Sequence, residues 1–483
     1  MAISLYTSRI VLQQLGVVDF GIYNVIGGVV ALFTFINSAM ASSTQRYLTY
    51  ALGKEDTSKI NLTFNTSLQI HFIIAIIVCI VAEIGGLWLI HHKMLIPSDK
   101  MSAANWVFQF SVLTLVINFI NVPYTAILIS YERMKTFAYI SLAEVSLKLV
   151  SAYLLVISPM DKLVFYSILM FCIPLIIRIL YTVYCHTNFN TVKIKKIYDK
   201  VLFKEMTFFA GWGIIGQIAG IGCTQGLNVL LNIFFGPAVN AARGIAVQVQ
   251  SAIYQFSYNF QTAVNPQITI SYAKGKIKEM HSLIFQSSKL TFFMLFALSL
   301  PIIIETPIIL RLWLVDVPEH TISFFRIIIW ICIIDSMANP LMVAASANGN
   351  IKKYQITIGG LLLLTVPISY VVLKLYHNPD SVFYVNLIIA IIAFISRLFI
   401  VRPLIQLSLR EFAAKVILPC FATGVISAIP PIMLYMMLPK SYTNVFIIII
   451  LSVLSVTFFA YFIGMNKNEK AFIKSSLLSR ITR

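Results

Sequence analysis

Residues 5–56 read LYTSRIVLQQLGVVDFGIYNVIGGVVALFTFINSAMASSTQRYLTYALGKED. They form two apolar runs separated by a Gly- and Asp-containing turn at residues 16–19, with Arg9 inside the first run and with Arg46 and Lys54 after the second. An arginine at the centre of a bilayer costs about 2.5 to 3.5 kcal/mol on insertion scales. We therefore expect Arg9 to face protein or a water-filled cavity rather than lipid.

Apolar runs of this kind continue through the whole chain. The 483 residues are 59% hydrophobic and only 11% charged, with a mean hydropathy of +0.87. This composition is too apolar for a soluble domain and predicts an all-α polytopic membrane protein. Windows of about 20 apolar residues predict fourteen transmembrane helices. Their ranges are 1–15, 19–45, 64–90, 104–130, 136–157, 162–186, 207–235, 238–270, 283–305, 320–346, 354–373, 381–402, 413–437 and 442–464.

The net charge of +18 is interpreted as a sign of how the chain is oriented in the membrane. Most basic residues gather in alternate short loops, such as 193–204 and 274–278, and in the tail 465–483. Cytoplasmic loops carry this excess, so both termini are expected in the cytoplasm, and no nucleic-acid partner is predicted. The six cysteines stand singly in or beside apolar runs, which favours buried thiols over a metal site. The first span is short, which suggests that the chain begins inside its first helix.

The chain contains an internal repeat with an offset of about 220 residues. Gly16 to Gly21 parallels Gly236 to Gly244, and two further pairs follow in the same order: Asn121-Val-Pro123 with Ala338-Asn-Pro340, and Arg178 with Arg397. An offset of six spans is even, so the halves should be parallel and related by an axis along the membrane normal. The sequence therefore predicts a six-helix bundle at 1–190, a second at 207–404 and two extra helices at 413–464.

A basic linker joins the predicted bundles at residues 191–206. Between Lys193 and Lys204, apolar residues fall on one helical face and lysines mainly on the other. This pattern is typical of an interfacial helix on an anionic leaflet. A solvated linker is the alternative.

Enzyme signatures are absent from the sequence. It has no Walker GxxxxGK[ST], HExxH or GxSxG motif, and its seven histidines are scattered. We predict no catalytic residues, no metal site and no cofactor. The Asn-x-Ser/Thr matches at Asn61 and Asn65 lie on the predicted cytoplasmic side, so they are attributed to chance.

Ionisable residues at membrane depth are the candidates for function. Arg243 and Arg9 occupy early positions in related parts of the two halves, where a guanidinium fork could capture phosphate. A structural pair, for example of Arg9 with Asp19, or snorkelling to the interface is the alternative. Arg46 is a third candidate cavity cation.

Carboxylates at membrane depth are fewer. Glu144 and Lys148 are four residues apart on one helix face, so they either neutralise each other or serve ion coupling or substrate contact. Glu83 and Asp335 have no obvious local partner, and burial could make either a proton carrier, although helix-packing roles are equally consistent. Arg178 and Arg397 lie near predicted cytoplasmic ends, which favours anchoring.

The opening of the chain resembles that of bacterial polysaccharide flippases, the O-antigen and exopolysaccharide exporters of the multidrug/oligosaccharidyl-lipid/polysaccharide (MOP) superfamily. The residues that carry the resemblance are Tyr6-Thr-Ser-Arg9, Leu15-Gly16, Asp19-Phe-Gly-Ile-Tyr-Asn24, Ala39-Met-Ala-Ser-Ser-Thr-Gln-Arg46 and Leu52-Gly53-Lys54. Val122-Pro-Tyr-Thr-Ala126, Tyr131-Glu-Arg-Met134 and Ala242-Arg-Gly-Ile-Ala246 are also similar to this family.

The resemblance implies a fold of two six-helix bundles around a V-shaped cavity, with two further helices that form a lipid-tail groove in the related lipid II flippase. It places Arg9 and Arg243 near cavity arginines of that relative. It also implies a substrate, a polyprenyl-diphosphate-linked oligosaccharide, and a location in the bacterial inner membrane among membrane lipids. A polysaccharide polymerase and glycosyltransferases are the implied protein partners.

Three functions remain open on the sequence. The first is a flippase working by alternating access in lipopolysaccharide or capsule biosynthesis. The second is a MATE-like multidrug or cation antiporter on the same scaffold, although organic cations require acidic cavity residues. The third is a membrane scaffold for polysaccharide assembly that transports nothing.

Overall fold

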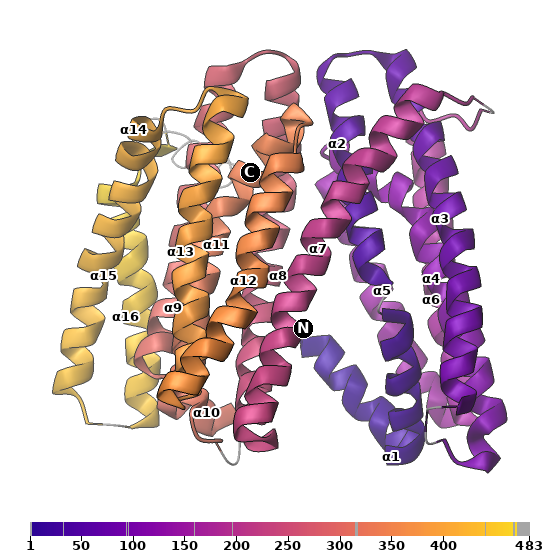
Figure 1. Cartoon of the computed structure of the whole chain (residues 1–483), viewed down its shortest axis with the longest axis horizontal. Coiled ribbons are helices and arrows are strands. Elements are labelled where there is room, and N and C mark those ends of the chain that lie inside the picture. Colours follow the sequence, from indigo (N-terminus) through magenta and orange to yellow (C-terminus); the bar gives the residue numbers. More distant parts are fainter. Residues whose placement is uncertain are drawn as a thin grey trace, which may run out of the picture. The chain divides into compact units, whose positions relative to one another are not determined.

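The computed structural model of the chain describes residues 2–470 except residues 32, 93, 95, 159, 196, 314–316, 440, 467 and 468. Several side chains of the first and eighth helices, including that of Arg9, also lie outside the description, as does most of the expected basic tail, 465–483. The part of the chain that the structure describes contains helices and no strands (Figure 1). The predicted all-α fold class is confirmed.

The helices follow the predicted apolar runs closely. The first half contains α1 (Ala2–Ala31), α2 (Thr34–Gly53), α3 (Thr57–His92), α4 (Met101–Ser130), α5 (Met134–Leu154) and α6 (Lys162–Asn188), and α7 (Lys200–Phe235) leads into the second half. The second half contains α8 (Pro237–Ala273), α9 (Ile277–Ile304), α10 (Thr306–Trp313), α11 (Thr321–Asn348), α12 (Lys352–Tyr376), α13 (Asp380–Ile405), α14 (Leu409–Phe412), α15 (Leu418–Met437) and α16 (Tyr442–Phe459).

Among the described residues, 11 helices are long and apolar enough to cross a membrane. The other three predicted spans are 1–15, 19–45 and 238–270. The first corresponds to the first part of α1, the second to the rest of α1 with α2, and the third to α8. Both α2 and α8 are dotted with Ser, Thr, Asn and Gln. Such residues suit helix packing and a hydrated interior better than a lipid-facing surface.

A sharp kink at Gly16 divides α1 into two legs. Gly16 has φ 77° and ψ 171°, a conformation that only glycine adopts readily. The kink confirms the predicted turn, and Figure 1 shows the change of direction. Just beyond it, Asp19 pairs with Lys100 at 3.0 Å, and Lys100 also lies 3.5 Å from Asp161 at the start of α6. The predicted span 19–45 is divided between the second leg of α1 and α2.

The chain forms two compact units, residues 1–214 and 215–483, which divide inside α7. In the first unit α4 packs against α1, α2, α3 and α6, and in the second unit α11 packs against α8, α9 and α13. Both central helices contain a proline, Pro123 in α4 and Pro340 in α11. These prolines are one of the pairs that define the sequence repeat.

Three amides of α3 bind the segment that precedes α7. Asn61 donates to the carbonyls of Thr191 and Lys193, Asn65 contacts Lys193 and Lys195, and Gln69 donates to Ile197, at 2.8 to 2.9 Å. Because these side chains take the backbone groups that a helix would use, the described residues of 191–199 are not helical.

The interfacial helix predicted to start at Lys193 is therefore wrong in its first part. Helix α7 begins at Lys200, and Asp199 caps it by accepting from the backbone amides of Val201 and Leu202.

The last two helices, α15 and α16, pack against each other and against α9. A buried ion pair joins α9 to the segment after α16. Lys289 Nζ lies 2.8 Å from Glu469 Oε2, and the two side chains are 4% and 7% exposed. Lys289 also donates to the carbonyl of Gly464 at 3.2 Å.

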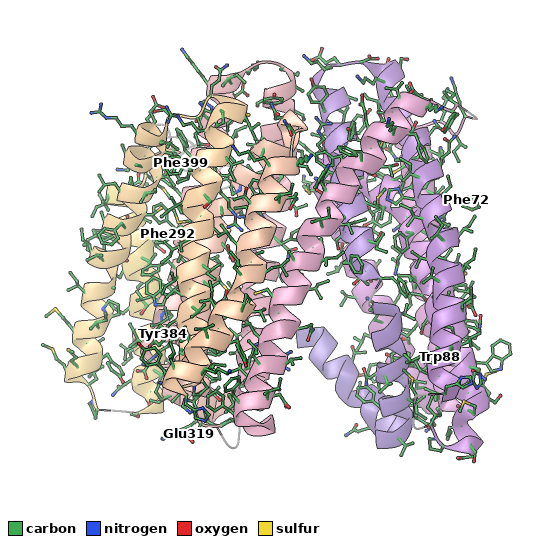
Figure 2. All side chains as sticks on the ribbon, viewed as in Figure 1. Phe72, Trp88, Phe292, Glu319, Tyr384 and Phe399 are labelled. Atoms are coloured by element: carbon green, nitrogen blue, oxygen red, sulfur yellow. The ribbon has the colours of Figure 1, made fainter. Side chains whose placement is uncertain are left out.

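Large apolar side chains cover the outer faces of several helices. Phe72 and Trp88 project from α3, both more than half exposed (Figure 2), and Phe399 is similarly exposed on α13. A surface of this kind is expected where a helix faces lipid.

Candidate functional site

A polar cavity of about 320 Å³ lies inside the second unit. It is lined by α8, α11, α12 and α13, and its polar residues are Tyr254, Ser257, Tyr258, Gln261, Asp335, Ser336, Asn339, Tyr354 and Arg397. The proline in α11 follows directly after this polar segment.

An ion pair forms the centre of this cavity. Arg397 Nη1 on α13 lies 2.9 Å from Asp335 Oδ1 on α11, and the hydroxyl of Tyr254 on α8 donates to Asp335 Oδ2 at 3.0 Å. Gln261 donates to the carbonyl of Ser336 at 2.9 Å. As expected, Asp335 has no partner that is local in sequence, because the arginine with which it pairs is 62 residues away in the chain. Arg397, predicted as an anchor, belongs to the cavity.

The first unit has a cavity of about 210 Å³, and its described lining contains no charged side chain. Its polar lining residues are Tyr23, Thr34, Ser111, Thr114, Asn118 and Ser167. With the repeat offset of about 220 residues, Thr34 corresponds to Tyr254 and Asn118 to Asp335. The two cavities therefore share positions on related helices, but of their described linings only the second contains an acid and a base.

Arg243, predicted to capture phosphate, is 5% exposed on α8. Its Nη1 donates to Asn228 Oδ1, and its Nη2 donates to the carbonyl of Thr224 at 2.9 Å. Both partners lie on α7, so the guanidinium joins two neighbouring helices. These contacts use two of the five N–H donors of the guanidinium, so a phosphate would bind through the remaining donors.

Arg46 lies in an aromatic environment within the first unit. Its guanidinium carbon is 4.4 Å from the ring centroid of Tyr47, 5.3 Å from that of Tyr50 and 5.5 Å from that of Phe209. An arginine over aromatic faces keeps its positive charge while its apolar stem is packed. The first leg of α1 carries Arg9, whose side chain lies outside the described residues.

The other predicted carboxylates also have partners. Lys148 Nζ lies 2.6 Å from Glu144 Oε1, and both side chains are about 40% exposed. Glu83, which has no obvious partner local in sequence, accepts a hydrogen bond from Gln109 on the neighbouring helix α4 at 2.9 Å. Among the described residues, no group of three or more His, Cys, Asp and Glu could hold a metal ion.

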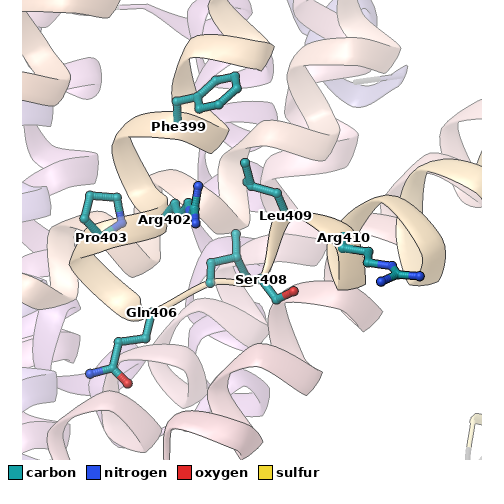
Figure 3. Close-up of a pocket in the computed structure, with 8 residues that line it drawn as sticks. Phe399, Arg402, Pro403, Gln406, Ser408, Leu409 and Arg410 are labelled. Carbon is teal, nitrogen blue, oxygen red and sulfur yellow. The ribbon is translucent and has the colours of Figure 1, made fainter.

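A larger, open hollow of about 730 Å³ lies at the end of α13 (Figure 3). Arg402 and Arg410 flank it, with Gln406 and Ser408 between them and Phe399 one turn away. Its position at the end of α13, away from Asp335 and Arg397, sets it apart from the cavity of the second unit.

The chain matches the MatE family model over residues 1–154. This match covers just under a third of the sequence and includes the kinked α1. No curated protein matches the chain in sequence.

Solved structures share the fold over most of the chain. A crystal structure of a MATE mutant has a TM-score of 0.70 and 13% identity, over 84% of this chain and 94% of that chain. An outward-facing multidrug resistance MATE transporter of the MOP superfamily has a TM-score of 0.71 and 13% identity, over 84% and 92%.

A MOP superfamily transporter from Pyrococcus furiosus, described as having a binding pocket of reverse polarity, gives the same values of TM-score, identity and coverage. At 13% sequence identity, these structures show that the chain shares their fold and nothing more specific.

Proposed function

We propose that this chain is a transporter that moves a polyprenyl-diphosphate-linked oligosaccharide across the bacterial inner membrane by alternating access. The fold it shares with MATE transporters supports a transporter rather than an enzyme. Related halves with polar cavities at membrane depth are the usual architecture of secondary transporters.

The choice of an anionic substrate rests on which charged side chains within the membrane spans already have a counter-charge. Two described carboxylates within the spans are already paired with cations, Asp335 with Arg397 and Glu144 with Lys148. A third, Glu83, accepts from the neutral amide of Gln109. A buried organic cation needs a carboxylate that is free to pair with it, because an uncompensated buried charge is costly. The hydrogen-bond partners described for Arg243, by contrast, are neutral oxygen atoms. This balance suits an anionic substrate better than a cationic one.

The cavities supply the remaining interactions. Tyrosine, glutamine and asparagine side chains offer donors and acceptors to sugar hydroxyls, and tyrosine rings offer apolar faces. Arg46 would meet the diphosphate, for which a planar guanidinium is better suited than lysine. The lipid tail would remain in the bilayer. A polysaccharide polymerase and glycosyltransferases are the partners that this activity requires.

A MATE-like multidrug or cation antiporter is the second candidate, and one observation favours it. Asp335 lies in a cavity large enough for a small ligand. If Arg397 moved away, the carboxylate could bind a cation. A multidrug resistance transporter shares the fold, so an organic cation is a suitable substrate with which to test this alternative.

Transport in reconstituted vesicles separates the two functions. We expect purified protein to move a fluorescent lipid-diphosphate oligosaccharide between leaflets and to leave a fluorescent organic cation untransported. Transport of the cation alone would contradict the flippase proposal and favour the antiporter. Transport of neither, in vesicles where the folded protein is verified, would favour a scaffold.

Arg243 variants refine the same assay. Arg243→Ala should reduce transport strongly, and Arg243→Lys should retain intermediate activity because it keeps the charge without the fork. Removing the guanidinium also takes the donor from Asn228 Oδ1, at a cost of about 1.5 to 3 kcal/mol for a hydrogen bond to a charged group. Loss of transport in variants that are still folded at the assay temperature would support phosphate capture. Loss of transport only where the variant has unfolded would show that Arg243 has a structural role. Arg311→Ala, at the exposed end of α10, is the control.

A further inference from the structure

Arg178 is a cation at membrane depth without an ion-pair partner in the described chain. It lies in α6, a helix long and apolar enough to span the membrane. No ion pair or hydrogen bond joins its guanidinium to another described residue, and its Nη1 atom is buried with no acceptor. A charge in a transmembrane helix normally pairs with a counter-charge or a backbone carbonyl, because leaving it alone is expensive.

The internal repeat shows which kind of side chain would pair with Arg178 if the two units were alike. Arg397, at the corresponding position of the second unit, pairs with Asp335 across α13 and α11. The related helices α6 and α4 also pack against each other. Asn118 precedes Pro123 of α4 by the same spacing as Asp335 precedes Pro340 of α11. The first unit therefore has the cation, with a neutral amide in the place of the carboxylate.

Arg178 also lies on the inner side of its helix. It follows Ser167 by three helical turns, so both side chains fall on one face of α6. Ser167 and Asn118 line the cavity of the first unit, whereas Arg178, three turns further along the same face, is not among its lining residues. The face that carries Ile179 and Val183 is the exposed one, with both side chains more than half exposed.

We propose that Arg178 is an anion-binding residue of the first unit and that its missing partner is a phosphate group carried by a lipid. A guanidinium and a phosphate form two parallel charge-assisted hydrogen bonds. By the repeat, a carboxylate in place of Asn118 would compete with the phosphate for the guanidinium, as Asp335 pairs with Arg397 in the second unit. The phosphate belongs to the transported lipid diphosphate or to an anionic phospholipid. The first source rests on the proposed function.

Ligand-induced thermal stabilisation of the full chain in nanodiscs tests this proposal. A ligand that binds the folded protein raises its unfolding temperature with concentration. The two probes are a polyprenyl diphosphate and phosphatidylglycerol, each added to a neutral phospholipid background. We expect wild-type protein to be stabilised by at least one probe, and Arg178→Gln to bind that probe at least about tenfold more weakly. Arg133→Gln, at an exposed arginine after α4, should bind as wild type does.

Stability without ligand distinguishes a binding residue from a structural one. Because Arg178 has no ion pair in the described chain, Arg178→Gln should melt at the wild-type temperature or above it. Asn118→Asp should supply the carboxylate found in the second unit, which raises the unfolding temperature and weakens binding. Wild-type binding of both probes by Arg178→Gln, or a lowered unfolding temperature of the ligand-free variant, would overturn the proposal.

The two probes also identify the source of the phosphate. Arg178-dependent binding of the polyprenyl diphosphate alone assigns the residue to the substrate pathway. Binding of phosphatidylglycerol alone assigns it to a structural lipid. Arg178-dependent binding by a wild-type protein that fails to transport the lipid-diphosphate oligosaccharide would leave the anion site standing and refute the proposed function.

Discussion

At the scale of single residues, charged side chains in this chain are organised by pairs between helices that are distant in sequence. Asp335 and Arg397 are 62 residues apart and meet at 2.9 Å. The sequence identifies both as unusual because they interrupt apolar runs. It does not reveal that they meet, because the pairing depends on how α11 and α13 pack. Glu144 and Lys148 could be paired from sequence, because one helical turn separates them.

Breaking the Asp335–Arg397 pair should destabilise the second unit. Asp335→Asn leaves the arginine without its counter-charge, which costs about 3 to 5 kcal/mol for a fully buried pair and less where water reaches the charges. We expect a clear fall in the unfolding temperature of the purified protein. The double variant Asp335→Asn/Arg397→Gln should recover most of it, because no charge is then stranded. Equal stability of the single and double variants would show that the pair is not coupled.

At the scale of helices, the kink in α1 is the feature that sequence predicted best. A glycine beside an aspartate between two apolar runs indicates a turn, and Gly16 adopts a positive φ there. The segment bound by Asn61, Asn65 and Gln69 was predicted less well. Helical periodicity of residues 193–204 was visible, but the amides that replace the helix are on α3, more than 120 residues earlier in the chain.

The kink makes Gly16 sensitive to substitution for one reason. A Cβ at this position would meet no atom within 4 Å, so only the backbone conformation opposes it. Gly16→Ala should cost about 1 to 3 kcal/mol. Gly21→Ala is the matched control, because Gly21 is helical with open space around its Cβ, and alanine should stabilise it slightly. Thermal unfolding of both variants checks the difference, and equal effects would argue against strain at Gly16.

At the scale of the whole molecule, hydropathy and the repeat were sufficient to predict an all-α membrane fold. Pro123 and Pro340 mark the related central helices in the sequence itself, because their spacing matches that of the other repeated pairs. The substrate could not be predicted with the same certainty, because it depends on which charges are left without a counter-charge after folding. Arg178 and Arg397 illustrate this limit, since Arg397 has a carboxylate partner and Arg178 has none among the described residues.

Orientation in the membrane is the remaining global prediction. From the basic loops we expect Lys195 and Lys276 on the cytoplasmic side, and Lys100 and Arg311 on the opposite side. Single cysteines at these positions, in a variant without the six native cysteines, can be labelled from outside intact cells. Labelling at position 195 together with protection at position 100 would show that the orientation is the opposite of the one predicted.

The buried pair of Lys289 and Glu469 has a consequence for the order in which the protein is made. The two residues are 180 positions apart. At a synthesis rate of about 5 to 20 residues per second, the ribosome reaches Glu469 roughly 10 to 40 seconds after Lys289. Throughout this interval the lysine of α9 has no Glu469 with which to pair. The contact that joins α9 to the segment after α16 can therefore form only when translation is almost complete.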